Sequence, residues 1–242
     1  MISAKQVQKV IALNYTIEPD DQAALTRLIN RQFANFEIDK LLTEFESLLA
    51  PWSTPPELKE IRFFEQPPWL RIQYYSANYL DENDGLVLAR IFRYDNDQLI
   101  VEHEYFVLPE NARGKMVGKK LLAASFEQYE RMGVKEIRVF AGLSDGGLVW
   151  AKVGFKATSR SEMDMILKIA QLSLSTEQFE DVQAIYDLYY TIEPDGTAFP
   201  IKDWALLGFM DNILKQVDWH GRIDLTNDKE LSNFKKYVNR EK

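Results

Sequence analysis

The amino-acid sequence predicts an α/β protein of the α+β type, with a mixed, mainly antiparallel sheet, helices on both faces and additional helical segments at both ends. Two observations support this prediction. Apolar residues recur at helical spacing near both ends of the chain, whereas the middle is dominated by runs of strand length and composition. The 242 residues are 46% hydrophobic and 27% charged, which is ordinary for a globular chain with a sizeable core.

Residues 1–50 carry three runs of apolar residues at helical spacing, and Asp20 or Asp21 is placed to cap the second predicted helix. Three prolines then end the pattern, because proline cannot continue a helix: Pro51, Pro55 and Pro56. We therefore expect a helical N-terminal segment over residues 1–56.

The period changes at about residue 60. Four runs rich in β-branched and aromatic residues predict an antiparallel meander: residues 61–64, 70–79, 86–94 and 99–107. The elements expected next are a helix at 115–132 closed by Gly133 and a strand at 136–140. A short helix from Asp145 or Gly146 to Val153, with Gly154 at its end, and a strand at 163–174 follow, and a turn of that strand into helix is left open. The strand–helix–strand order implies a right-handed crossover. We expect this core to span residues 57–174.

Beyond residue 175 the helical pattern returns. Helices are expected at 179–189, at 204–217 and from Lys229, with a short strand at 223–225. This C-terminal extension, residues 175–242, could cover the sheet, shape a substrate cleft or hold a partner.

One hexapeptide, Tyr-Thr-Ile-Glu-Pro-Asp, occurs twice, at residues 15–20 and 190–195. Turn chemistry explains Pro-Asp without any function, because proline stops a helix and aspartate starts the next element. The alternative is a pair of equivalent docking elements, which would allow a homo-oligomer.

Composition excludes several classes of function. With 29 basic and 37 acidic residues the net charge is −8, so extensive nucleic-acid binding is not expected. The chain has no cysteine and two histidines, which excludes thiolate sites and gives no basis for a metal centre. It shows neither a secretory signal nor an apolar run of membrane-spanning length, so we expect a cytoplasmic protein that does not enter a membrane.

Cations and glycines gather at the junction between the fourth predicted strand and the helix that follows: Arg113, Gly114, Lys115, Gly118, Lys119 and Lys120. A helix start offers unpaired backbone N–H groups and the positive end of the helix dipole, and glycines let a ligand come close. Because the rest of the chain is acidic, we expect one local anion site here, with a phosphate as its natural ligand. The alternative is a solvated basic helix start.

The segment RGKMVG, residues 113–118, resembles the Arg/Gln-x-x-Gly-x-Gly pyrophosphate loop of the GNAT superfamily, the acyl-CoA-dependent N-acyltransferases. The segment VWAKVGFKA, residues 149–157, resembles that superfamily's later helix-to-strand segment, which usually ends Tyr-x-x-x-Gly-Phe. The two motifs stand in the family's order, and the resemblance covers roughly residues 60 to 172.

This resemblance implies acetyl-CoA as co-substrate and an acetyl group transferred to a primary amine of an unidentified acceptor. An acidic surface suits a cationic acceptor. The residues implied to bind the co-substrate are Phe106, Val107, Leu108, Arg113, Gly114, Lys115, Met116, Val117, Gly118, Lys119 and Asp145.

Acylation of an amine also needs a group that accepts the ammonium proton. Strand alternation places Glu102 and Glu104 on one face, and Val101, His103 and Tyr105 on the other. Glu104 is the first candidate for the base and Glu102 the second. The alternative is that both are solvent-facing carboxylates on a half-exposed strand.

Two departures from the family pattern favour a rival hypothesis, a catalytically inactive GNAT-fold module that binds a protein. Met116 stands where the first motif glycine is usual. Trp150 stands where many members carry a tyrosine that protonates the leaving thiolate, and an indole cannot do so. A core aromatic is the favoured interpretation of Trp150.

Overall fold

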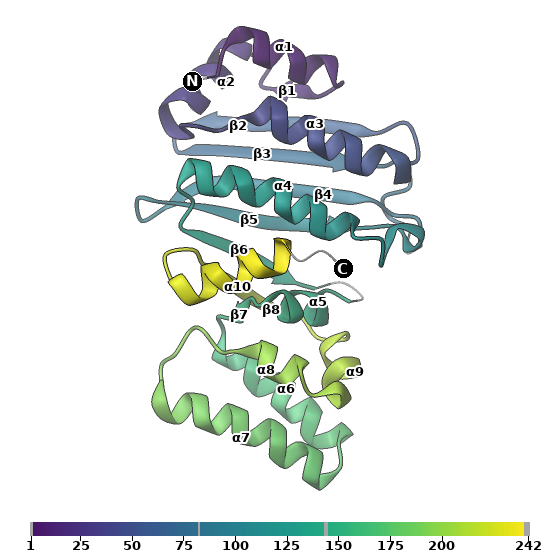
Figure 1. The fold of residues 1–242 in the computed structure, drawn as a ribbon, viewed down its shortest axis with the longest axis vertical. Helices are drawn as coiled ribbons and strands as arrows, with labels where there is room; N and C mark the ends of the chain where they lie inside the picture. Colours follow the sequence, from purple (N-terminus) through teal and green to yellow (C-terminus); the bar gives the residue numbers. More distant parts are fainter. Residues whose placement is uncertain (1, 82, 143–144, 240–242) are drawn as a thin grey trace. The chain divides into compact units, whose positions relative to one another are not determined.

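A computed structural model describes residues 2–81, 83–142 and 145–239 of the chain. The chain forms two compact units, Met1–Lys135 with Val238–Lys242, and Glu136–Tyr237. Each unit combines helices with a mainly antiparallel sheet, as the sequence predicts (Figure 1). This division falls inside the segment expected as one core, and the boundaries proposed from the sequence stay predictions.

The first unit opens with the three predicted helices, α1 (Ala4–Ala12), α2 (Gln22–Gln32) and α3 (Ile38–Leu49), followed by the short 3-10 helix η1 (Ala50–Trp52). Asp21 is the residue that caps α2, where its carboxylate accepts a hydrogen bond of 2.8 Å from the backbone N–H of Ala24. A short strand between α1 and α2, β1 (Thr16–Glu18), was not predicted.

The predicted meander is confirmed: β2 (Leu58–Glu65), β3 (Pro68–Tyr75), β4 (Val87–Asp95) and β5 (Gln98–Val107) pair antiparallel in sequence order. β1 pairs in parallel with β2 at the edge. Strand β5 leads through η2 (Glu110–Ala112) into α4 (Val117–Met132), which ends at Gly133 as expected.

Helices α3 and α4 lie side by side across one face of this sheet (Figure 1). Beneath them Phe92 of β4 contacts Phe36 and Tyr129, with ring centroids 5.0 and 6.0 Å apart. We call the opposite side of β1–β5 the open face. It carries charged and polar residues in alternate positions: Glu18, Glu60, Arg62, Arg71, Gln73, Arg93, Glu102 and Glu104. The expectation of helices on both faces stays a prediction.

The second unit contains a three-stranded antiparallel sheet in which β8 (Trp219–Asp224) lies between β6 (Glu136–Ala141) and β7 (Lys156–Ala157). Its helices are α5 (Gly146–Val153), α6 (Arg160–Ser173), α7 (Thr176–Ile192), α8 (Ile201–Ala205), η3 (Gly208–Met210), α9 (Asp211–Leu214) and α10 (Asp228–Asn239). Helix α5 ends at Gly154, as predicted.

Two predictions in this unit are wrong. Residues 163–174 form helix α6 rather than a strand, since Ser159 caps a helix whose buried residues recur at helical spacing: Met163, Ile166 and Ala170. The single helix expected at 204–217 is broken into α8, η3 and α9.

The repeated hexapeptide takes two conformations. Its first copy forms β1, whereas the second forms the last turn of α7. The second copy is held by Arg160, whose guanidinium lies 4.5 Å from the centre of the Tyr190 ring and donates a 2.8 Å hydrogen bond to the carbonyl of Pro194. A shared helix-exit turn is therefore the wrong interpretation, and the two copies are not structurally equivalent.

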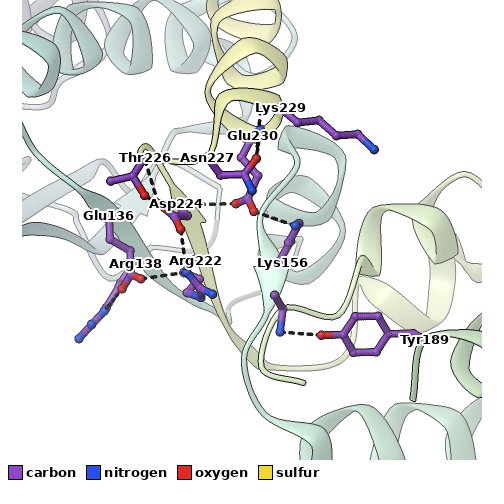
Figure 2. A network of polar contacts seen from close by, with 11 residues as sticks. Glu136, Arg138, Lys156, Tyr189, Arg222, Asp224, Thr226, Asn227, Lys229 and Glu230 are labelled. Atoms are coloured by element: carbon purple, nitrogen blue, oxygen red, sulfur yellow. Dashed lines mark hydrogen bonds and ion pairs between the residues drawn. The ribbon is translucent and has the colours of Figure 1, made fainter. Parts of the chain in front are cut away.

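A polar network joins the second unit's sheet to the start of α10 (Figure 2). Glu230 accepts a 2.9 Å hydrogen bond from the backbone N–H of Asp224 and pairs with Lys156 at 2.7 Å. Arg222 reaches Glu136 at 3.2 Å. Burial alone would raise the pKa of Asp224, but hydrogen bonds from Thr226 hold it below its ordinary value. Since each of these charges has a partner of opposite sign, we assign the network a structural role.

Candidate functional site

The junction of β5 and α4 contains two residues in left-handed backbone conformation. We call residues 113–119 the α4 entry loop. Gly114 has φ 72° and Met116, which caps α4, has φ 67°. Glycine adopts this conformation freely, whereas a residue with a side chain pays about 1–2 kcal/mol. Met116 is therefore strained, and it occupies the position where the GNAT pyrophosphate loop usually has its first glycine.

The α4 entry loop presents unpaired backbone donors. The first hydrogen bond of the helix runs from the N–H of Lys120 to the carbonyl of Met116, at 3.0 Å. Within the part of the chain that the structure describes, no hydrogen bond is made by the N–H groups of Gly114, Met116, Val117, Gly118 and Lys119. Donors of this kind at a helix start bind anions.

The cations of the loop differ in their surroundings. Lys115 lies over the ring of Trp52, with Nζ 5.2 Å from the ring centre. Arg113 donates through Nε to the carbonyl of Leu108 at 3.0 Å. Lys119 and Lys120 make no ion pair with any residue in the described ranges. The loop therefore combines cations with free N–H groups, as the anion-site prediction requires.

Packing accounts for the glycine at position 118. A Cβ atom there would lie 3.3 Å from the ring of Phe106 and 3.5 Å from the side chain of Leu108. The start of α4 is thereby held directly against the end of β5, where Phe106, Val107 and Leu108 were predicted to contact the co-substrate.

A β-bulge precedes this contact. Ala89 of β4 lies opposite Tyr105, but the next residue, Arg90, lies opposite His103, so Glu104 is the extra residue of β5. The bulge changes the alternation of side chains: His103 is buried at 3% exposure, whereas Tyr105 is 48% exposed. The expectation that these two residues share a face is therefore wrong. Bulges re-aim side chains and are frequent next to active sites.

Both candidate bases lie on the open face and are paired with arginines. Glu104 binds Nε of Arg71 at 2.6 Å, and Glu102 accepts a 2.8 Å hydrogen bond from Nε of Arg93. Arg71 also donates to the hydroxyl of Tyr75 at 3.3 Å. These pairs fix the carboxylates in position. They were not predicted, because the two partners of each pair are far apart along the chain.

Behind the bulge lies a buried polar cluster that the sequence did not reveal. His103 and the hydroxyl of Tyr129 share a 2.9 Å hydrogen bond, and Arg90 lies beside them with no exposed surface. Burial and then the charge of Arg90 lower the pKa of His103 well below its ordinary value. Burial raises the pKa of Tyr129 and lowers that of Arg90. At neutral pH the cluster therefore holds a neutral imidazole, a neutral phenol and one cation.

The remaining predicted residues lie in the second unit. Asp145 is the N-cap residue of α5 but makes no side-chain capping bond. Trp150 is 7% exposed and packs edge-on against Phe155, with ring centroids 5.1 Å apart, as expected for a core aromatic. The other predicted site residues all belong to the first unit, whereas Asp145 belongs to the second.

The described part of the chain has neither a metal-binding cluster nor a membrane-spanning helix. Among residues 2–81, 83–142 and 145–239, no three histidine or acidic side chains gather as a metal ion would require. In the same ranges no helix combines the length and apolarity needed to cross a membrane. No family model matches the chain, and no curated protein matches it.

Proposed function

We propose that the protein is a cytoplasmic N-acyltransferase that transfers an acetyl group from acetyl-CoA to a primary amine. The observation that carries this proposal is the α4 entry loop, where unpaired N–H groups and cations converge at the end of a strand. The pyrophosphate of CoA suits such a site because it offers several anionic oxygens at once.

The reaction follows from this placement. With its pyrophosphate at the α4 entry loop, the co-substrate would extend its pantetheine arm along Phe106, Val107 and Leu108, toward the bulge at Glu104. The amine attacks the thioester carbonyl carbon, a C–N bond forms, the C–S bond breaks, and CoA leaves as the thiolate. Glu104 accepts the proton of the ammonium group, directly or through water, with Arg71 positioning its carboxylate. Glu102 is the second candidate for this role.

A second function is favoured by two observations. Met116 is strained and places a side chain where a ligand would approach the backbone, and Trp150 is a core residue that cannot protonate a thiolate. A protein of this fold without catalytic activity would instead use its helical extensions to bind another protein.

Calorimetric titration with acetyl-CoA, with CoA and ATP as comparison ligands, tests the proposal. We expect saturable binding of acetyl-CoA and CoA and none of ATP. Absence of binding up to millimolar concentration would favour the interaction module.

Two variants locate the site. Gly118→Asp introduces bulk against Phe106 together with a negative charge, whereas Gly118→Asn introduces nearly the same bulk without the charge. We expect Gly118→Asp to abolish CoA binding and Gly118→Asn to weaken it much less. Unchanged CoA affinity in a folded Gly118→Asp protein would contradict the assignment of the CoA site to the α4 entry loop. Once turnover with an amine is found, Glu104→Gln should lose turnover and keep binding.

A further inference from the structure

Arg90 is a fully buried cation with no counter-ion among the residues that the structure describes. Its side chain has no exposed surface, and within the described ranges no carboxylate lies at ion-pair distance. Its Nη1 donates to the carbonyls of Ala89 and Tyr105, at 2.8 and 3.1 Å, while Nε and Nη2 make no hydrogen bond of 3.5 Å or less in the described ranges. The neutral hydroxyl of Tyr129 lies nearby and only partly offsets the effect of burial, which lowers the pKa of Arg90. Buried charges are normally paired, because removing a lone ion from water costs several kcal/mol.

The first unit also contains a buried cation that follows the usual rule. Lys59 is 6% exposed, and its Nζ lies 2.7 Å from both carboxylate oxygens of Glu46. The missing counter-ion of Arg90 is therefore not a general feature of this core.

Arg90 lies one aromatic ring away from the α4 entry loop. Its guanidinium carbon is 5.3 Å from the centre of the Phe106 ring, and the ring edge lies 3.3 Å from where a Cβ of Gly118 would be. The buried cation thus lies over the face of the same ring whose edge packs against Gly118. Because the guanidinium has no exposed surface, water screens its charge very little.

We propose that the counter-ion of Arg90 is the bound ligand itself, a phosphate-bearing anion held at the α4 entry loop, and that Arg90 is a positioning residue for that anion. The inference rests on the proposed function only in placing an anion at this loop. The new element is that the positive charge of Arg90 is balanced only when a negatively charged ligand binds.

The expected effect is about tenfold in affinity, for one ligand charge on the order of 10 Å from the guanidinium at an effective dielectric constant of about 20. Because the charge is buried, this loss should persist at high salt, whereas the effect of the exposed Lys115 should be screened.

The test is calorimetric titration of the full chain with inorganic pyrophosphate, at low and high salt, alongside a thermal melt of each free protein. Arg90→Met should bind pyrophosphate about tenfold more weakly at both salt concentrations, with an unfolding temperature equal to or above that of the wild type. A control double variant, Lys59→Met with Glu46→Gln, removes a buried cation together with its counter-ion and should bind as the wild type does.

Arg90→Lys, titrated at pH 6 to favour the charged amine, separates charge from shape. Affinity within about threefold of the wild type supports the electrostatic role. Affinity as weak as that of Arg90→Met would mean that the guanidinium only shapes the bulge, and would overturn the proposal. Unchanged pyrophosphate affinity in Arg90→Met, or no binding by the wild type, would also overturn it. If the wild type binds pyrophosphate but not CoA, the inference stands and the proposed acyltransferase activity fails.

Discussion

His103 predicts a loss of stability in mild acid. The folded protein keeps this imidazole neutral, because burial and the neighbouring Arg90 lower its pKa well below 6.5. In the unfolded chain the same histidine titrates with an ordinary pKa of about 6.5. The unfolded state therefore binds more protons below that pH, and the free energy of unfolding falls as the pH drops.

The magnitude follows from the linkage relation. If His103 stays neutral in the folded state down to pH 5, lowering the pH from 7 to 5 removes about 2 kcal/mol of stability through this residue alone. The contribution is fully present above the unfolded pKa and is lost progressively below it.

Urea denaturation at pH 7 and pH 5 measures this effect. The wild type should lose about 2 kcal/mol more over that interval than His103→Gln, which cannot titrate. The other histidine, His220, is present in both proteins, so any contribution from it cancels in this comparison. Equal losses in the wild type and His103→Gln would refute the assignment of a neutral buried imidazole.

Three further predictions concern stability. Met116→Gly should be more stable than Met116→Ala by about 1 kcal/mol in urea denaturation, because only glycine relieves the left-handed strain at φ 67°; equal stabilities would contradict this. Gly147→Ala should lower the free energy of unfolding by about 2 kcal/mol or more, because its Cβ would lie 2.2 Å from the carbonyl oxygen of Leu214. Gly208→Ala is the control: its Cβ would have nothing within 4 Å, so its stability in thermal denaturation should equal that of the wild type. Lys59→Met should lower the free energy of unfolding, measured in urea, by about 3 kcal/mol, because it leaves Glu46 unpaired. The double variant Lys59→Met with Glu46→Gln should recover most of this stability. A double variant no more stable than Lys59→Met would argue against a stabilising ion pair.

Local pattern was enough to predict most elements of the fold. The four meander strands, the helix closed by Gly133 and the short helix closed by Gly154 all follow from periodicity and from glycine at helix ends. Helix α6 was missed because its closely spaced apolar residues match a buried strand as well as a helix. The signal that decides between them, Ser159 followed three residues later by Glu162, is a helix cap.

The candidate site was predictable only where its residues are contiguous. The α4 entry loop is a single segment, so its cations and glycines stand together in the sequence. The pairing of Arg71 with Glu104 and the position of Arg90 beneath Phe106 depend on strand register and on a bulge. A one-residue change of register reverses the side of every side chain in a strand, and the sequence pattern does not fix a bulge.

The two copies of Tyr-Thr-Ile-Glu-Pro-Asp give the molecule an internal reference for measuring the influence of tertiary surroundings. Thr16 and Thr191 have identical neighbours on the C-terminal side through the end of the hexapeptide, yet one lies in a strand and the other in a helix. Intrinsic hydrogen-exchange chemistry within the copies is therefore almost the same. Any difference in amide protection between residues 16–18 and 191–193 reports how much each unit stabilises its own copy, in one sample and without a mutation.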